Sequence, residues 1–111
     1  MDYDAYDIAE VYDGWSILSL LWLEALRMCG RGEAAKFVEG GERIALDGEL
    51  PICTSGGQLS AGRLHGYLQT YEACVQLRGR AGERQVSPVP EVALASTGAN
   101  HFTGAVLLST G

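Results

Sequence analysis

The most informative part of the sequence is a glycine-rich segment that runs directly into a helical pattern: Ser55-Gly56-Gly57-Gln58-Leu59-Ser60-Ala61-Gly62-Arg63-Leu64-His65-Gly66-Tyr67. From residue 64 the apolar residues recur at 64, 67, 68, 71, 74 and 75, which is the spacing of one stripe on a helix. Glycine lets a backbone approach another group closely, and a helix N-terminus offers free N–H groups and a positive dipole end. The segment is therefore a candidate site for an anionic or polarised oxygen.

The patterns on either side of this segment predict the other elements of one α/β domain. In chain order they are a strand at 8–12, a helix at 15–29 that stops at Gly30, a short helix at 33–38, an extended piece at 50–53, a helix at 60–78, and strands at 91–96 and 105–109. The segment 97–104 is too long for a two-residue hairpin turn. This order of strands and helices indicates α/β layering.

The predicted helix at 15–29 is apolar around almost its whole circumference. A helix of this kind must be buried on more than one side. A chain of 111 residues has few elements with which to cover it. We therefore expect this helix to face a partner outside the chain.

Composition excludes several classes of function. A net charge of −6 argues against nucleic acid or an anionic membrane surface as the partner. The longest apolar run, 15–26, is too short to span a bilayer, so no membrane span is expected. The three cysteines contain no Cys-x-x-Cys pair, which argues against a zinc site, and without a signal peptide they indicate reduced thiols in a cytoplasmic protein.

Three segments resemble, in order and spacing, corners of the C-terminal half of the thiolase superfamily. Residues 9–15, Ala-Glu-Val-Tyr-Asp-Gly-Trp, are similar to the corner written Asn-Glu-Ala-Phe or His-Asp-Cys-Phe in that family. Residues 56–63 resemble its Gly-Gly-x-x-x-x-Gly-His loop, and residues 95–98 lie where the family has Cys-x-Gly-Gly. The resemblance implies a layered α/β fold with a mixed sheet and covering helices. It also implies that residues 1–111 are a thiolase-like C-terminal domain whose N-terminal half is absent.

The departures from the family pattern fall on its functional positions. Tyr12 stands where the family has Asn or His, Arg63 replaces the histidine of the glycine loop, and Ser96 or a neighbour replaces the last cysteine. Arginine does not accept a proton near neutral pH, and an unactivated serine is a poor base. The family's nucleophilic cysteine belongs to its N-terminal half, so we do not expect Claisen condensation or thiolysis from these residues alone.

This pattern resembles the lipid-transfer-protein-like thiolase homologues that act as aldolases on steroid side-chain coenzyme A thioesters, in which tyrosines handle protons. The resemblance implies that Tyr12 and Tyr67 border one pocket, with Arg63 as the cation that lowers the pKa of a tyrosine base. The N–H groups of the glycine loop would hold the enolate oxygen. The expected catalytic residues are thus Tyr12, Tyr67 and Arg63, and the expected substrate-binding residues are Gly56, Gly57, Gly62, Ser96 and Gly98.

The same resemblance implies the ligands and partners. Coenzyme A thioester is expected as the substrate, with no tightly bound cofactor and no metal. The expected partner is an N-terminal thiolase half or a second thiolase-like subunit, and the aldolase relatives also pair with a small zinc-ribbon and OB-fold protein. An acyltransferase of the thiolase type and a non-catalytic, truncated module remain as alternatives to the aldolase.

Simpler roles remain open for several of the residues that could take part. Tyr12 and Tyr67 could serve packing alone, and Asp13 is of a type that caps the following helix. His65, off the apolar stripe, is expected at the surface, and His101 is expected to fill the long turn. A cation at a helix start, as expected for Arg63, opposes the helix dipole, which favours an ion-paired or functional role as much as a solvated one.

Overall fold

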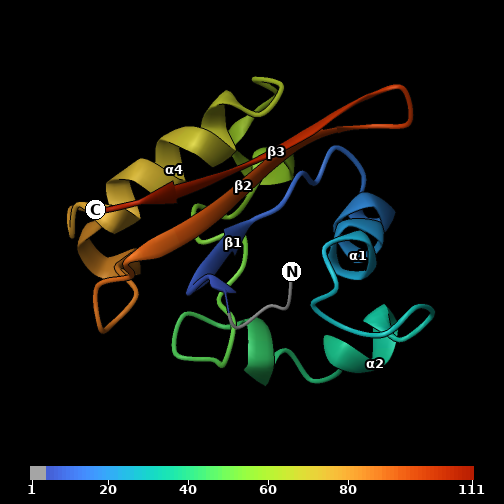
Figure 1. Cartoon of the computed structure of the whole chain (residues 1–111), viewed down its shortest axis with the longest axis horizontal. Coiled ribbons are helices and arrows are strands. Elements are labelled where there is room, and N and C mark those ends of the chain that lie inside the picture. Colours follow the sequence, from blue (N-terminus) through green and yellow to red (C-terminus); the bar gives the residue numbers. More distant parts are fainter. Residues whose placement is uncertain (1–4) are drawn as a thin grey trace.

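The computed structural model describes residues 5–111, which form a three-stranded mixed sheet with helices on both faces (Figure 1). The first strand, β1 (Ile8–Glu10), pairs in parallel with the central strand, β2 (Val92–Ala99). On its other side β2 pairs antiparallel with β3 (Phe102–Ser109). The extended piece at 50–53 adds a parallel bridge between Ile52 and Ala9 at the other edge of β1.

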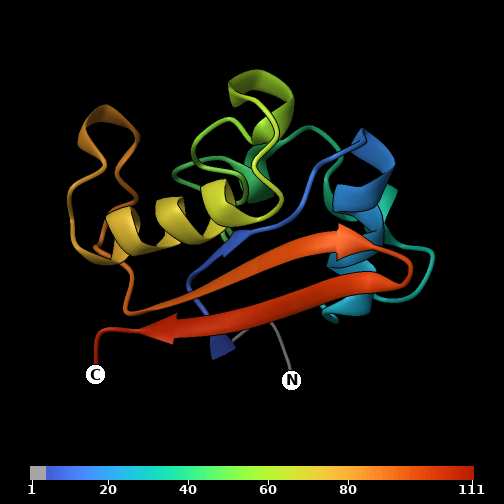
Figure 2. The ribbon, with the colours of Figure 1, turned by 90° about the horizontal axis from the view of Figure 1, so that it is seen from above.

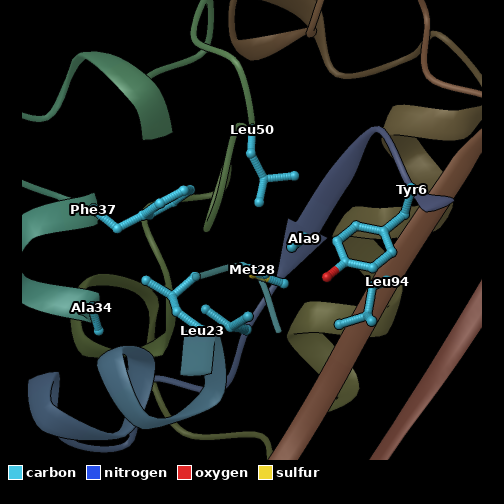
Figure 3. Close-up of a cluster of buried hydrophobic side chains, with 9 residues drawn as sticks. Tyr6, Ala9, Leu23, Met28, Ala34, Phe37, Leu50 and Leu94 are labelled. Atoms are coloured by element: carbon cyan, nitrogen blue, oxygen red, sulfur yellow. The ribbon is translucent and has the colours of Figure 1, made fainter. Parts of the chain in front are cut away.

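The side chains of β1 and β2 alternate between two cores, as the period of a strand requires. Ala9 and Leu94 face the side covered by α1 (Ser16–Ala25) and α2 (Ala34–Phe37). The core on that side also holds Tyr6, Leu23, Met28, Phe37 and Leu50 (Figure 3). Ile8, Ala93 and Ala95 face the opposite side, where they pack on Ala73 and Leu77 of α4 (Tyr67–Leu77). Figure 2 shows α4 running alongside the sheet, apart from α1. The predicted α/β layering is thus confirmed.

The predicted helix at 60–78 is wrong in its first part. The structure has a short helix, α3 (Gln58–Ala61), then a loop over 62–66, and α4 begins only at Tyr67. Gly62 and Gly66 have φ of 109° and 89°, outside the range of a right-handed helix, and His65 has φ of 46°. Arg63 therefore lies in this loop and not at a helix start.

The long turn expected over 97–104 is also wrong. Both strands continue into this segment, and the turn consists of Asn100 and His101 alone. Asn100 has φ of 59°, a conformation that asparagine tolerates and that two-residue hairpin turns require. Gly98 has φ of 77°, and a Cβ there would collide with the carbonyl oxygen of Phe102 across the hairpin. Glycines that look like loop residues in the sequence thus belong to the strands.

The first long helix ends at Ala25, four residues before the predicted end, because Arg27 takes φ of 58°. Leu23 is fully buried, whereas Ile17 and Leu21 are more than half exposed. Residues 5–111 therefore cover one side of α1 and leave an apolar side uncovered. Two short 3-10 helices, η2 (Glu42–Ile44) and η3 (Gly82–Arg84), complete the elements described. Within 5–111, no helix has the length and apolar character needed to cross a membrane.

Candidate functional site

The candidate site lies where the end of β1, the glycine segment, the 62–66 loop and the end of the hairpin converge. Tyr12, two residues after β1, donates its backbone N–H to Oγ of the buried Ser96 on β2 at 2.9 Å. Its ring folds over Gly14, since a Cβ on that glycine would lie 2.8 Å from the phenol oxygen. The serine thus anchors the backbone of Tyr12, and the missing side chain at residue 14 leaves room for its ring.

A hollow of about 300 Å³ opens beside this ring, and we call it the first hollow. Its polar lining consists of Tyr12, Gln58, Arg63, His65 and Asn100. Trp15, Leu18 and Phe102 form its apolar wall, and Gly98 is also part of the lining. In the part of the chain that the structure describes, the guanidinium of Arg63 makes no ion pair, so its charge is available to a ligand in the hollow.

A second hollow of about 370 Å³ lies between the start of α4 and the sheet. Tyr67, Ser96 and Val106 line it, and Tyr67 is 79% exposed. The two tyrosines therefore line separate hollows, and the single pocket expected for them is not observed. His65 belongs to the lining of both hollows.

The N–H groups of the glycine segment are already used within the chain. Asp13 Oδ1 accepts the N–H of Gln58 at 2.8 Å, and Asp13 Oδ2 accepts that of Leu59 at 3.4 Å. The N–H of Gly56 donates to the carbonyl of Cys53, and the N–H of Gly57 donates to Ser55 Oγ at 3.4 Å. These four N–H groups have partners within the chain, and the expectation that the glycine loop holds an enolate oxygen stays a prediction.

The position of the Asp13 carboxylate explains why residue 57 is a glycine. It also shows that the role expected for Asp13 is wrong. A Cβ on Gly57, which has φ of 74°, would overlap the Asp13 carboxylate. The N-cap of α1 is Trp15, with no side-chain hydrogen bond, so Asp13 caps α3 and not the helix that follows it. Gly56 and Gly57 thus shape the Asp13 contact, and Gly62 shapes the loop that carries Arg63. Neither hollow has these three glycines in its lining.

The cysteines of the described residues do not supply a nucleophile to either hollow. None of the three lines the first or the second hollow. Burial raises the pKa of Cys53 to about 12, so its thiol is protonated near neutral pH.

The sequence matches the family described as "Thiolase C-terminal domain-like" over residues 1–109. The chain belongs to the thiolase C-terminal domain family. It is 42% identical over 84 residues to "17-hydroxy-3-oxo-4-pregnene-20-carboxyl-CoA lyase" of Mycobacterium tuberculosis, covering 76% of this chain and 20% of that protein. It is 42% identical over 91 residues to "Sterol carrier protein 2" of Homo sapiens, covering 79% of this chain and 16% of that protein.

A solved structure, titled "Ltp2-ChsH2(DUF35) aldolase", superposes on 98% of this chain with a TM-score of 0.81 and 33% sequence identity. This thiolase C-terminal domain corresponds to 28% of that chain. The chain therefore spans less than a third of the length of each of these proteins. The family and the fold class inferred from the three corners are confirmed.

Gln58 and His65 line the first hollow and are not among the site residues predicted from the sequence. The Gln58 carboxamide has no hydrogen-bond partner among residues 5–111, and its Oε1 is buried. The expectation that His65 lies at the surface is confirmed, since the residue is exposed, but its place beside the first hollow was not predicted. The signal that could have found it is the pair Gly62 and Gly66, since glycines on both sides of a histidine indicate a loop.

A buried network of carboxylates lies behind the site, on the α4 side of the sheet. Thr54 Oγ1 lies 2.5 Å from Glu10 Oε1 and 2.8 Å from Glu72 Oε1, and both glutamates are 1% exposed. A hydroxyl has one proton and can donate to only one of the two, so a proton on Glu10 completes the other contact. Arg84 binds both oxygens of Glu72 at 2.9 Å.

The surroundings separate the pKa values of these two carboxyl groups. Burial raises the pKa of Glu10 to about 7, against the hydrogen bonds from Thr54. Burial also acts to raise the pKa of Glu72, but hydrogen bonds from Arg84, Thr54 and Gln76 outweigh it and hold that pKa below its ordinary value. Glu10 is therefore the group that retains a proton as the pH approaches 7.

Proposed function

We propose that this domain is part of an enzyme that acts on acyl-CoA thioesters and cleaves the carbon–carbon bond of a β-hydroxyacyl-CoA by a retro-aldol reaction. The observation that carries the proposal is the composition of the first hollow, where Tyr12 and Arg63 meet and no cysteine of residues 5–111 is present. The similarity to a CoA lyase and to a protein titled an aldolase supports the same reaction class.

Retro-aldol cleavage needs donors for the oxygen of the thioester enolate and an acceptor for the β-hydroxyl proton. A phenol and a guanidinium both donate hydrogen bonds. Tyr12 and Arg63 therefore fit the enolate oxygen. Tyr67, across the 62–66 loop, would contact the apolar part of the substrate in the second hollow.

The uncovered side of α1 supports a partner. Trp15, Ile17 and Leu21 are between 53% and 71% exposed. We propose that an N-terminal thiolase half, or a second thiolase-like subunit, covers this surface and supplies the rest of the coenzyme A site. A zinc-ribbon and OB-fold partner belongs to the same proposal, and so does a cytoplasmic location, which the free cysteines support.

The test uses the assembled protein, meaning this chain together with the polypeptide that supplies the remaining thiolase-like half. Its substrate is 17-hydroxy-3-oxo-4-pregnene-20-carboxyl-CoA, the compound named in the mycobacterial relative, and the measurement is the appearance of a shorter acyl-CoA. We expect cleavage, and a loss of kcat of about 10²-fold or more for Tyr12→Phe. The matched Tyr67→Phe variant should change KM more than kcat.

The acyltransferase alternative is tested in the same preparation. Sterol carrier protein 2 and an acetyl-CoA acetyltransferase are among the similar proteins. Thiolysis of a 3-ketoacyl-CoA without cleavage of the hydroxylated thioester would reject the aldolase and favour the acyltransferase. Correct assembly without either reaction would favour a non-catalytic module.

A further inference from the structure

His65 occupies a constrained position between the two hollows. Its backbone φ of 46° is uncommon for a residue with a side chain. The next residue, Gly66, packs so closely on β2 that a Cβ there would collide with Thr97. The 62–66 loop is therefore held on the sheet, and the imidazole is placed at the junction of the first and second hollows.

The imidazole of His65 has no hydrogen bond or ion pair within the described part of the chain. The titratable side chains that share its hollows are Tyr12 and Arg63 on one side and Tyr67 on the other. No carboxylate lines either hollow among residues 5–111, and among the side chains that do line them the imidazole of His65 is the type most often used as a general base.

The two hollows differ in the part of a thioester that they suit. The first presents the hydrogen-bond donors Tyr12 and Arg63. The second is walled largely by small and apolar residues such as Ala95, Ala105 and Val106. If a substrate placed its thioester in the first hollow and its apolar body in the second, its Cα–Cβ bond would lie beside His65.

We propose that His65 is the general base of the cleavage, an assignment that rests on the proposed retro-aldol function. The imidazole takes the proton of the β-hydroxyl as that oxygen forms a carbonyl with Cβ. The Cα–Cβ bond breaks and its electron pair passes into the thioester enolate, whose oxygen is held by Tyr12 and Arg63. The imidazolium then returns the proton to Cα, so that the products are a ketone and a shorter acyl-CoA and no other reactant is consumed.

The test compares two histidine variants in the assembled protein. His65→Asn removes the base and keeps a residue that tolerates positive φ. His101→Asn makes the same change at the hairpin turn, where the side chain lines neither hollow. For His65→Asn we expect kcat to fall by about 10²-fold or more with little change in KM, loss of the acidic limb of the pH profile, and partial rescue by added imidazole.

The outcomes separate this assignment from the proposed function. Cleavage by the wild type together with an unchanged rate and pH profile in His65→Asn would overturn the role of His65 and leave the aldolase standing. A wild type that assembles and does not cleave would overturn both. Equal losses in His65→Asn and His101→Asn would also count against the assignment, because they would point to a general effect of the substitution.

Discussion

The carboxylate of Asp13 accepts the backbone N–H of Gln58 at 2.8 Å and thereby joins the end of β1 to the glycine segment. This contact spans 45 residues of sequence and is buried. It fixes the relative positions of residues 9–15 and 56–63, two of the segments on which the family resemblance rests. It also gives the backbone N–H groups of Gln58 and Leu59 a partner within the chain.

Replacing Asp13 by alanine should therefore weaken the domain as well as the site. The variant leaves the buried N–H of Gln58 without a partner and removes the weaker contact with Leu59. We expect the free energy of unfolding of this chain to fall by about 2–3 kcal/mol, measured by urea denaturation. Asp47→Ala, at an exposed carboxylate, is the control and should stay within about 0.5 kcal/mol of the wild type. Equal losses of unfolding free energy in the two variants would show that the Asp13 contact does not stabilise the domain more than an exposed carboxylate does.

Gly66→Ala should disturb the loop that carries His65. A methyl group at this position adds a collision with Thr97 to the cost of a left-handed backbone. Gly32→Ala is the matched control, since Gly32 has a similar φ of 80° with no atom within 4 Å of the added carbon. We expect Gly66→Ala to lower the free energy of unfolding by about 2 kcal/mol more than Gly32→Ala. A difference near zero would mean that the loop moves freely off β2.

The three corners could be read from the sequence because each is a local pattern at the end of a strand or the start of a helix. Their order along the chain, with the apolar strands at 91–96 and 105–109, was enough to indicate the family and the fold class. The composition of α1 also indicated that residues within the chain would not cover all of its apolar surface. Leu23 packs in the core, and Leu21 is 53% exposed.

The errors arose where tertiary contacts override local pattern. The helical stripe includes Leu64, but that residue is 59% exposed in the loop before α4, because Gly62 and Gly66 adopt positive φ. The pairing of Asp13 with Gln58 cannot be seen in the sequence, since neither spacing nor composition joins positions so far apart. The separation of Tyr12 from Tyr67 depends on that same loop.

The buried pair of glutamates predicts a dependence of stability on pH. The pKa of Glu10 is about 7 in the folded chain, against an ordinary value of 4.5. Between these values the native state binds more protons than the unfolded state, so the free energy of unfolding falls as the pH rises. This group alone should account for a loss of about 3 kcal/mol across the window. The lowered pKa of Glu72 acts in the opposite sense, and at lower pH.

Glu10→Gln isolates this effect, because glutamine can donate to Thr54 at every pH. We expect the variant to match the wild type near pH 4.5 and to exceed its stability by about 3 kcal/mol above pH 7. Glu83→Gln, at an exposed carboxylate on η3, should follow the wild type throughout. Parallel curves for Glu10→Gln and the wild type would contradict the raised pKa.

The indole of Trp22 joins α1 to the hairpin at the site. Its Nε1 donates to the carbonyl of Gly98 at 3.1 Å, in the strand segment that lines the first hollow. Trp22→Phe removes this donor and part of the packing, so we expect the free energy of unfolding to fall by about 1–2 kcal/mol. Trp15→Phe is the control, because Trp15 is 71% exposed and has no such bond among the described residues. Urea denaturation followed by circular dichroism measures both variants without relying on tryptophan fluorescence. A larger loss of unfolding free energy for Trp15→Phe than for Trp22→Phe would show that the contact with Gly98 does not hold α1 to the sheet.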